Sequence, residues 1–234
     1  MTKIANNQFI ELSYTGKTTD DDAIFDTTEN KVVDEHHLHA HDVQPMSICV
    51  GRGHLIPGLD KDLVGKEIGK SYSITLDPEE AYGKKQANLI QLIPTSKFKN
   101  QEVRPARGMT VDIDGNKGII KTTGGGRTLV DFNHPLAGRE VTYDYTINKI
   151  ITDVKDKIKA VSKIMLGIEP SDVTIKDGSA TLTMEHDMPK EIVPEMEKQF
   201  KEHISEIKKV TFKKAAPSTE KEESLKTSPS TQEK

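Results

Sequence analysis

The segment Leu55-Ile56-Pro57-Gly58-Leu59-Asp60 decides the fold of this chain. Two adjacent aliphatic residues are followed by a rigid Pro-Gly turn, and Leu59 and Leu63 then lie one helical turn apart. This spacing predicts the end of a strand followed by a short helix that presents an apolar floor. The segment contains no nucleophile, so it does not indicate covalent catalysis.

Aromatic residues lie on both sides of this segment in the sequence. Tyr14 and the pair Phe25-Asp26 precede it, and the block Asp77-Pro78-Glu79-Glu80-Ala81-Tyr82-Gly83 follows it. We expect these aromatic side chains to wall the apolar floor and to complete a pocket.

In this order and spacing, the blocks resemble the FKBP family of peptidyl-prolyl cis-trans isomerases. A Pro-Gly turn or an Ala-Tyr-Gly triplet alone occurs by chance in many proteins, whereas the whole series is specific. The residues that carry the match are Tyr14, Phe25, Asp26, Gly51, Leu55-Ile56-Pro57-Gly58-Leu59, Leu63, Gly65, Gly69, Pro78 and Ala81-Tyr82-Gly83. The resemblance implies an enzyme that accelerates Xaa-Pro isomerisation in unfolded or folding proteins and needs no cofactor. Its partners would be unfolded or nascent polypeptides that contain proline.

The chain after Gly83 predicts a separate small β unit. Strand-like segments at residues 88–94, 108–113, 118–123 and 128–132 are separated by turn signals such as Asp114-Gly115. Such a module resembles the insert-in-flap domain of SlyD-like FKBPs. The motif Asp131-Phe132-Asn133-His134-Pro135-Leu136-Ala137-Gly138 resembles the signature that follows that insert, and we expect His134 to be a structural hydrogen-bonding residue rather than a general base.

The chain beyond residue 151 changes to a helical pattern. Val154, Ile158, Val161 and Met165 share one helix face, Pro170 is expected to end that helix, and Pro189 is expected to open a second one. Between the helices, Asp177-Gly178 indicates a hairpin. These features predict an αββα(β) domain, which could dimerise or dock to a partner.

Together these patterns predict an α+β chain with four parts. They are an FKBP-like antiparallel sheet with a short helix (residues 1–83 plus 132–151), an inserted small all-β domain (84–131), the C-terminal αββα(β) domain (152–213) and a disordered tail (214–234) rich in Ser, Thr, Lys and Glu.

The resemblance also implies which residues line the proline pocket. They are Tyr14, Phe25, Asp26, Met46, Leu55, Ile56, Leu59, Tyr82 and Tyr143. Asp26 is expected to accept a hydrogen bond from the Tyr14 hydroxyl, while the Tyr82 hydroxyl and the Ile56 backbone N–H would hold carbonyls of the peptide. Leu59, Met46 and Tyr143 depart from the compact FKBPs, in which Trp, an aromatic residue and Phe are more usual. These departures put tight binding of macrolide inhibitors in doubt, but not isomerase activity.

The inserted unit carries many apolar residues for its size, which predicts an exposed patch for non-native chains. The residues expected to bind such chains are Leu89, Ile90, Leu92, Ile93, Phe98, Met109 and Ile113. Chaperone binding at this patch would deliver prolines to the neighbouring pocket.

Two other functions compete with a folding enzyme. In the first, the pocket only binds proline-containing segments, and the protein is a non-catalytic holdase. In the second, residues 35–42 handle a metal ion, because His36, His37, His39 and His41 and flanking carboxylates suit zinc or nickel. A solvated loop is the simpler interpretation of this window, so no metal site is predicted.

Composition excludes further classes of function. No apolar run approaches the roughly 20 residues needed to cross a bilayer, and residues 1–10 lack an apolar signal core, so we expect no membrane partner and a cytoplasmic location. The formal net charge is -4, and Lys is interspersed with acidic residues, which argues against a nucleic-acid surface.

Overall fold

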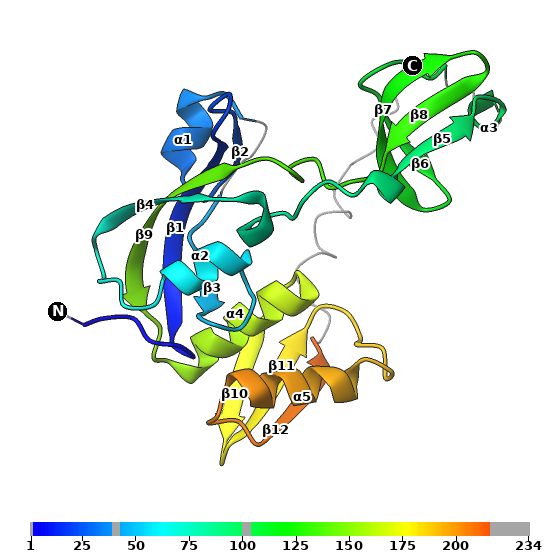
Figure 1. Cartoon of the computed structure of the whole chain (residues 1–234). Helices are drawn as coiled ribbons and strands as arrows, with labels where there is room; N and C mark the ends of the chain where they lie inside the picture. The colour runs from blue at the N-terminus through cyan, green and yellow to red at the C-terminus, as the bar shows by residue number, and fades with distance from the viewer. Residues whose placement is uncertain (1, 39–42, 100–103, 216–234) are drawn as a thin grey trace, which may run out of the picture. The chain divides into compact units, whose positions relative to one another are not determined.

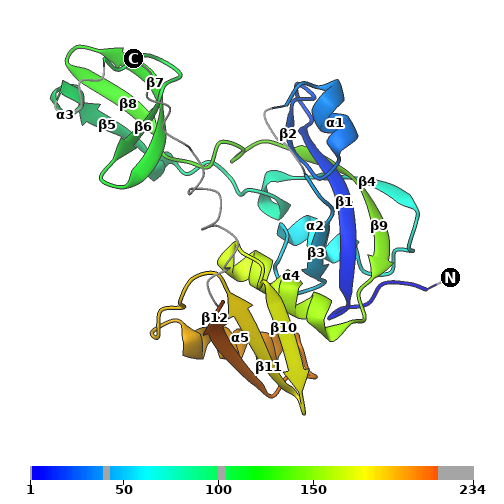
Figure 2. The same ribbon diagram turned by 180° about the vertical axis from the view of Figure 1, so that it is seen from behind.

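A computed structural model describes residues 2–38, 43–99 and 104–215 of the chain (Figure 1). By contacts, the chain divides into two compact units, Met1–Ile150 and Ile151–Lys234. Among the described residues, the first unit contains two sheets and the second contains one, and their strands are labelled in Figure 2.

The first sheet of the first unit is antiparallel throughout. Its strands are β2 (Ile24–Thr27), β1 (Phe9–Thr18), β9 (Val141–Ile150) and β4 (Ser71–Leu76) in that order, and β3 (Met46–Cys49) also pairs with β1. We call it the FKBP sheet. Buried and half-buried residues alternate along most of β1, as expected for a strand with one face on a core.

The strand β1 is longer than predicted. The sequence predicts a strand over residues 8–14 and a polar turn over residues 15–22, but Thr15 pairs with Asp144 and Lys17 pairs with Thr142 of β9. Pairing with β9 satisfies the backbone N–H and C=O groups of this segment, which favours a strand although the sequence is polar. The pairing therefore overrides the local preference for a turn.

The short helix predicted from the Pro-Gly segment is α2 (Pro57–Asp62). It begins at Pro57, whose fixed φ suits the first helical position. Leu59 and Leu63 are almost completely buried, with exposed fractions of 1% and 0%. Both leucines are therefore core residues, and the apolar floor of a pocket stays a prediction. Two further short elements, α1 (Asn30–Glu35) and the 3-10 turn η1 (Pro78–Glu80), accompany the sheet.

The insert forms its own four-stranded antiparallel sheet. Its order is β5 (Ile90–Pro94), β8 (Arg127–Asp131), β7 (Asn116–Gly124) and β6 (Thr110–Ile113), with η2 (Ala87–Leu89) and α3 (Ser96–Lys99) beside it. Asp114 and Gly115 both have positive φ, at 53° and 82°, as the predicted tight turn requires. The insert core consists of Ile93, Phe98, Val111, Ile120 and Val130.

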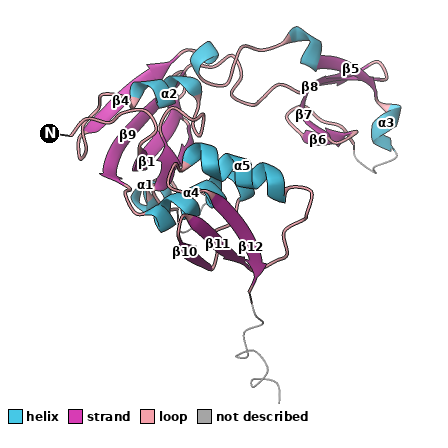
Figure 3. Ribbon diagram, turned by 90° about the horizontal axis from the view of Figure 1, so that it is seen from below, coloured by secondary structure: helices cyan, strands magenta, loops and turns pink. Residues whose placement is uncertain are grey.

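The second unit has the order of elements that the sequence predicts (Figure 3). They are α4 (Val154–Leu166), β10 (Asp172–Lys176), β11 (Ser179–Met184), α5 (Val193–His203) and β12 (Lys209–Lys214). The strand β11 pairs antiparallel with β10 and parallel with β12.

The helix ends of the second unit differ from the prediction. α4 ends at Leu166 because Gly167 adopts a left-handed conformation with φ 71°, so Pro170 lies beyond the helix. α5 begins at Val193 rather than at Pro189. At the other end of the unit, Lys214 belongs to β12 instead of a tail, and the rest of the expected tail, from residue 216, lies outside the described residues.

The coarse fold prediction is confirmed, since the sheets are mostly antiparallel and the helices are few. Within the part of the chain that the structure describes, no helix has the length and apolar character needed to span a membrane.

Candidate functional site

Four aromatic residues of the predicted pocket form one group of contacting rings, which we call the ring cluster: Tyr14, Phe25, Tyr82 and Tyr143. Tyr14, Phe25 and Tyr143 come from β1, β2 and β9, which are neighbours in the FKBP sheet, and Tyr82 follows η1. The Phe25 ring meets Tyr82 and Tyr143 edge-on, with centroid distances of 5.9 and 5.7 Å. The Tyr14 and Tyr143 centroids are 5.7 Å apart. These separations are those of favourable aromatic pairs.

Hydroxyl groups of the ring cluster have defined partners. The Tyr14 hydroxyl donates to Asp26 Oδ2 at 2.8 Å, which is the hydrogen bond that the sequence predicts. The hydroxyls of Tyr82 and Tyr143 are 2.9 Å apart and share a hydrogen bond. Asp26 is exposed, so its carboxylate marks the polar edge of an otherwise apolar group.

These hydroxyls are neutral at physiological pH. Burial, followed by the charge of Asp26, raises the pKa of Tyr14 far above its usual value. Burial and the hydrogen bond with Tyr82 do the same to the pKa of Tyr143, and burial raises the pKa of Tyr82. The site therefore offers neutral O–H groups beside aromatic faces.

Alkaline pH is expected to destabilise the protein through these tyrosines. The pKa values of Tyr14, Tyr143 and Tyr145 are raised in the folded state, the last by burial and by its 2.5 Å hydrogen bond to Asp62. Their contribution is therefore fully present below about pH 10, the pKa of an unfolded tyrosine, and is lost as the pH rises above it. The urea concentration at the midpoint of unfolding should be lower at pH 11 than at pH 9.

Tyrosinate absorbance measures the same effect directly. In urea, all five tyrosines of the chain should ionise near pH 10, whereas fewer should do so in the native protein. Native ionisation of all five near pH 10 would contradict the environment described for the ring cluster.

Gly16 lies against the ring cluster, and sequence reasoning missed it. A Cβ atom at this position would lie 2.8 Å from the Phe25 ring and 2.9 Å from the Tyr143 ring. The rings thus lie directly over the backbone of β1, where only glycine fits. A glycine inside a strand is the sequence signal for such a close approach.

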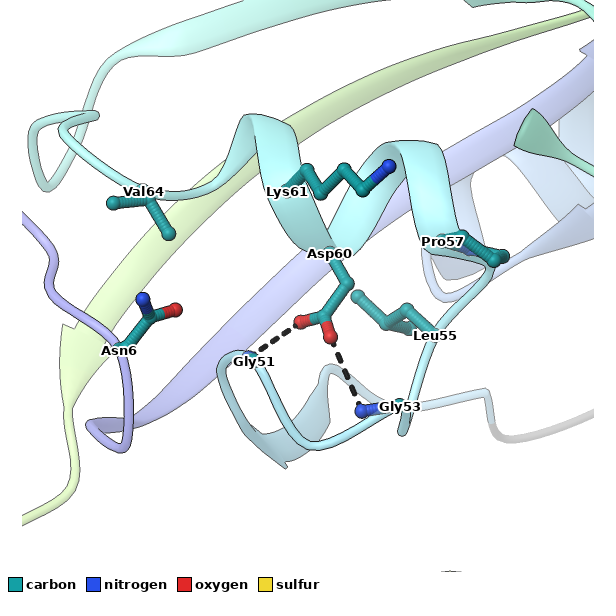
Figure 4. Close-up of a pocket in the computed structure, with 8 residues that line it drawn as sticks. All are labelled: Asn6, Gly51, Gly53, Leu55, Pro57, Asp60, Lys61 and Val64. Carbon is teal, nitrogen blue, oxygen red and sulfur yellow. Dashed lines mark hydrogen bonds between the residues drawn. The ribbon is translucent and has the colours of Figure 1, made fainter.

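The aliphatic pocket residues come from β3 and from the turn into α2. Met46 lies opposite Leu12 of β1 and is half-buried, as are Leu55 and Ile56, while Leu59 is buried. Leu55 also lines a pocket of about 400 Å³ with Asn6, Gly51, Gly53, Pro57, Asp60, Lys61 and Val64 (Figure 4). None of these eight described lining residues is aromatic.

Asp60 explains the shape of the loop before α2, and sequence reasoning missed it. Its two carboxylate oxygens accept hydrogen bonds from the backbone N–H groups of Gly51 and Gly53, at 2.8 and 3.1 Å (Figure 4). Both glycines have positive φ, at 78° and 70°. Asp60 is buried and therefore holds this loop against the start of α2.

Two of the seven residues proposed for the insert patch belong to the insert core instead. Ile93 and Phe98 have exposed fractions of 8% and 1%, because they pack with Val111, Ile120 and Val130. Leu92 and Met109 are exposed, at 53% and 36%. The remaining three, Leu89, Ile90 and Ile113, are half-buried.

The histidine window falls partly outside the described structure. His36 and His37 follow α1 and are exposed, whereas His39 and His41 lie outside the described residues. Among the residues that are described, no three His, Cys, Asp or Glu side chains are grouped to hold a metal ion.

Comparison with known proteins identifies related sequences along the first unit. A family model described as FKBP-type peptidyl-prolyl cis-trans isomerase matches residues 1–99, and one described as FKBP26, IF domain matches residues 91–136. The short-type peptidyl-prolyl cis-trans isomerase of Methanocaldococcus jannaschii is 33% identical over 133 residues, which cover 56% of this chain and 84% of that protein.

Proteins named SlyD are similar over longer stretches. The FKBP-type peptidyl-prolyl cis-trans isomerase SlyD of Vibrio cholerae is 29% identical over 159 residues, or 67% of this chain and 73% of that protein. The SlyD of Haemophilus influenzae is 29% identical over 145 residues, or 60% and 69%. With these matches, the chain belongs to the FKBP-type peptidyl-prolyl cis-trans isomerases and is SlyD-like.

Proposed function

We propose that the ring cluster, with Asp26 at its edge, is the site at which this isomerase acts on Xaa-Pro bonds. The observation that carries the proposal is the meeting of Tyr14, Phe25, Tyr82 and Tyr143 from four separate segments. One hydrogen bond joins the hydroxyls of Tyr82 and Tyr143, and another joins the Tyr14 hydroxyl to Asp26. Met46, Leu55, Ile56 and Leu59 are proposed to complete its apolar lining. The pocket around Asp60 is less suitable because its described lining residues include no aromatic side chain.

The chemistry needs no covalent step. A planar Xaa-Pro amide is stabilised by charge-separated resonance, and its rotation faces a barrier of about 20 kcal/mol. Twisting abolishes that resonance, so a pocket that withholds water from the carbonyl favours the twisted amide over the planar one. The rings supply the apolar surroundings, and the membership of the chain in an enzyme family sets the holdase alternative aside.

The Tyr82 hydroxyl is proposed to orient the substrate. In the substrate-free structure it bonds to Tyr143, and a peptide carbonyl would replace that partner. Tyr82 is half-buried and Tyr143 is buried. Replacing the Tyr143 hydroxyl by the peptide carbonyl therefore requires movement of the Tyr82 side chain alone.

Tyr82→Phe is expected to lower kcat/KM for a short Xaa-Pro peptide by about 2- to 10-fold, the value of one neutral hydrogen bond. Tyr72→Phe is the matched control, since Tyr72 accepts a hydrogen bond from the Glu67 backbone and lies outside the ring cluster. Equal activity of Tyr82→Phe and the unaltered protein would contradict the role of this hydroxyl.

We further propose the four-part organisation described above, with residues 84–131 as a chaperone domain. The insert has its own sheet and core, and it still exposes Leu92 and Met109. Exposed apolar side chains of this kind are typical of surfaces that bind unfolded chains. Unfolded, proline-containing polypeptides captured there would be substrates for the neighbouring site.

The double variant Leu92→Ser/Met109→Ser is expected to slow the catalysed refolding of a protein limited by proline isomerisation. Activity on a short peptide should not change, because the peptide needs only the ring cluster. Gln91→Ser is the control, since Gln91 is an exposed polar residue of the same strand. If the double variant catalyses refolding of the substrate protein as fast as the unaltered protein does, Leu92 and Met109 have no role in chaperone function.

Two expectations about the whole chain stay predictions. If residues 152–213 mediate dimerisation or partner docking, the chain without this segment should sediment as a monomer without a partner, whereas the intact chain should sediment as a dimer or with its partner. Cell fractionation would test the cytoplasmic location.

A further inference from the structure

The ring of His134 lies flat on the ring of Tyr82. Their centroids are 4.6 Å apart and their planes differ by only 4°. The other side of this histidine is held by the backbone, since His134 Nδ1 accepts a hydrogen bond from the Leu136 N–H at 3.2 Å. Two contacts, one within its own turn and one with Tyr82, therefore hold this exposed imidazole.

The residue before His134 fixes this turn to the segment that follows Tyr82. Asn133 Oδ1 accepts from the Gln86 N–H at 2.8 Å, and Asn133 Nδ2 donates to the Gln86 carbonyl at 3.1 Å. The Gly138 N–H also donates to the Gly83 carbonyl at 2.8 Å. These bonds join the two connections between the insert and the FKBP sheet, so the backbone that carries His134 is held beside Tyr82.

Tyr82 needs such a support more than the other rings of the cluster. Tyr14 and Tyr143 lie on paired strands of the FKBP sheet, whereas Tyr82 follows the short turn η1 and belongs to no strand. Its hydroxyl bond to Tyr143 is the bond that the substrate carbonyl is proposed to replace. During the reaction, the stack on His134 and the edge contact with Phe25 would then hold the Tyr82 ring.

We propose that His134 is a positioning residue for the isomerase reaction. Its imidazole fixes the plane and place of the Tyr82 ring, so that the Tyr82 hydroxyl meets the substrate carbonyl without a search over ring orientations. His134 itself does not touch the reacting bond and transfers no proton. The inference rests on the proposed function of the ring cluster, and in particular on the role of Tyr82.

Two substitutions separate the stack from the turn. His134→Phe keeps a flat aromatic ring but loses the acceptor for the Leu136 N–H. His134→Asn loses the ring but keeps a side-chain acceptor that suits a backbone N–H two residues on. If the stack matters, His134→Asn should lower kcat/KM for a short Xaa-Pro peptide by about 2- to 10-fold, and His134→Phe should retain most of the activity.

A purely structural role in the turn predicts the opposite order, with His134→Phe the more damaged, and that result would overturn the proposal. His186→Asn is the matched control, because His186 is an exposed histidine of the second unit. Urea midpoints of all variants check that each is folded. Should His134→Asn fail to fold, His134→Gln replaces it, since it also lacks a ring.

A double-mutant cycle tests whether His134 acts through Tyr82. In a Tyr82→Ala background, the loss caused by His134→Asn should disappear, because no ring remains to be positioned. An undiminished loss in that background would overturn the inference and leave the pocket assignment intact. If Tyr82→Ala alone left activity unchanged, the role of Tyr82 in the pocket would fail, and this inference with it.

Discussion

Phe98→Ala is expected to unfold the insert while the FKBP sheet stays folded. Phe98 is among the largest fully buried side chains described, and it packs in a core to which the described residues contribute five buried side chains. Truncating a buried phenylalanine costs about 3 to 5 kcal/mol. A unit as small as residues 84–131 has a small free energy of unfolding, and we expect the cost of this substitution to exceed it.

Two-dimensional amide NMR and a peptide assay measure the two parts separately. Dispersed signals of β5 to β8 should be lost, those of the FKBP sheet should persist, and short-peptide isomerisation should continue. The physical reason is that, among the described residues, the strands of the insert pair only with one another. Catalysed refolding of a whole protein should fall towards the rate of an insert-deleted chain.

Leu92→Ala is the control for this prediction. Leu92 is also apolar but is 53% exposed, so its truncation should leave the insert folded. If the insert stays folded in Phe98→Ala and is about as stable as in Leu92→Ala, Phe98 does not belong to the core of the insert.

Phe25→Ala is expected to lower kcat/KM for a short Xaa-Pro peptide by about 10- to 100-fold. Phe25 makes edge contacts with both Tyr82 and Tyr143, and each aromatic pair is worth about 0.5 to 1.5 kcal/mol. Losing two such pairs admits water beside the twisting amide and frees the Tyr82 ring. Both effects raise the barrier, at about 1.4 kcal/mol for each factor of ten.

Protease-coupled peptide turnover, at peptide concentrations that separate kcat from KM, measures this loss. Phe25→Leu is the matched variant, because it keeps apolar volume without an aromatic edge and should fall between alanine and phenylalanine. Activity of Phe25→Ala within twofold of the unaltered protein would contradict the assignment of the ring cluster.

Much of the fold could be predicted because its signals are local. Proline at the first position of α2, alternation along β1 and the Asp114-Gly115 and Asp177-Gly178 turns all depend on neighbours within a few residues. Errors occurred where pairing or local caps decide the boundary. β1 continues through residues 15–18 because β9 pairs with it, and α4 stops at Leu166 because Gly167 is left-handed.

The site was predictable only as a set of residues. The order of aromatic and Pro-Gly segments identified Tyr14, Phe25, Asp26, Tyr82 and Tyr143 by resemblance, and the structure brings these five together. Nothing in their spacing indicates that Gly16 must lie beneath two of the rings. That requirement arises from the close approach of side chains on neighbouring strands.

The sequence by itself determined the kinds of element that build the protein, because short-range patterns of apolar, turn and aromatic residues specify them. Its resemblance to a known family indicated the family and the reaction. Only the tertiary structure decided which apolar side chains of the insert are core and that His134 stacks on Tyr82. The shared hydrogen bond of Tyr82 and Tyr143 joins residues 61 positions apart. Contacts of such sequence separation follow from strand pairing and packing, which no local pattern encodes.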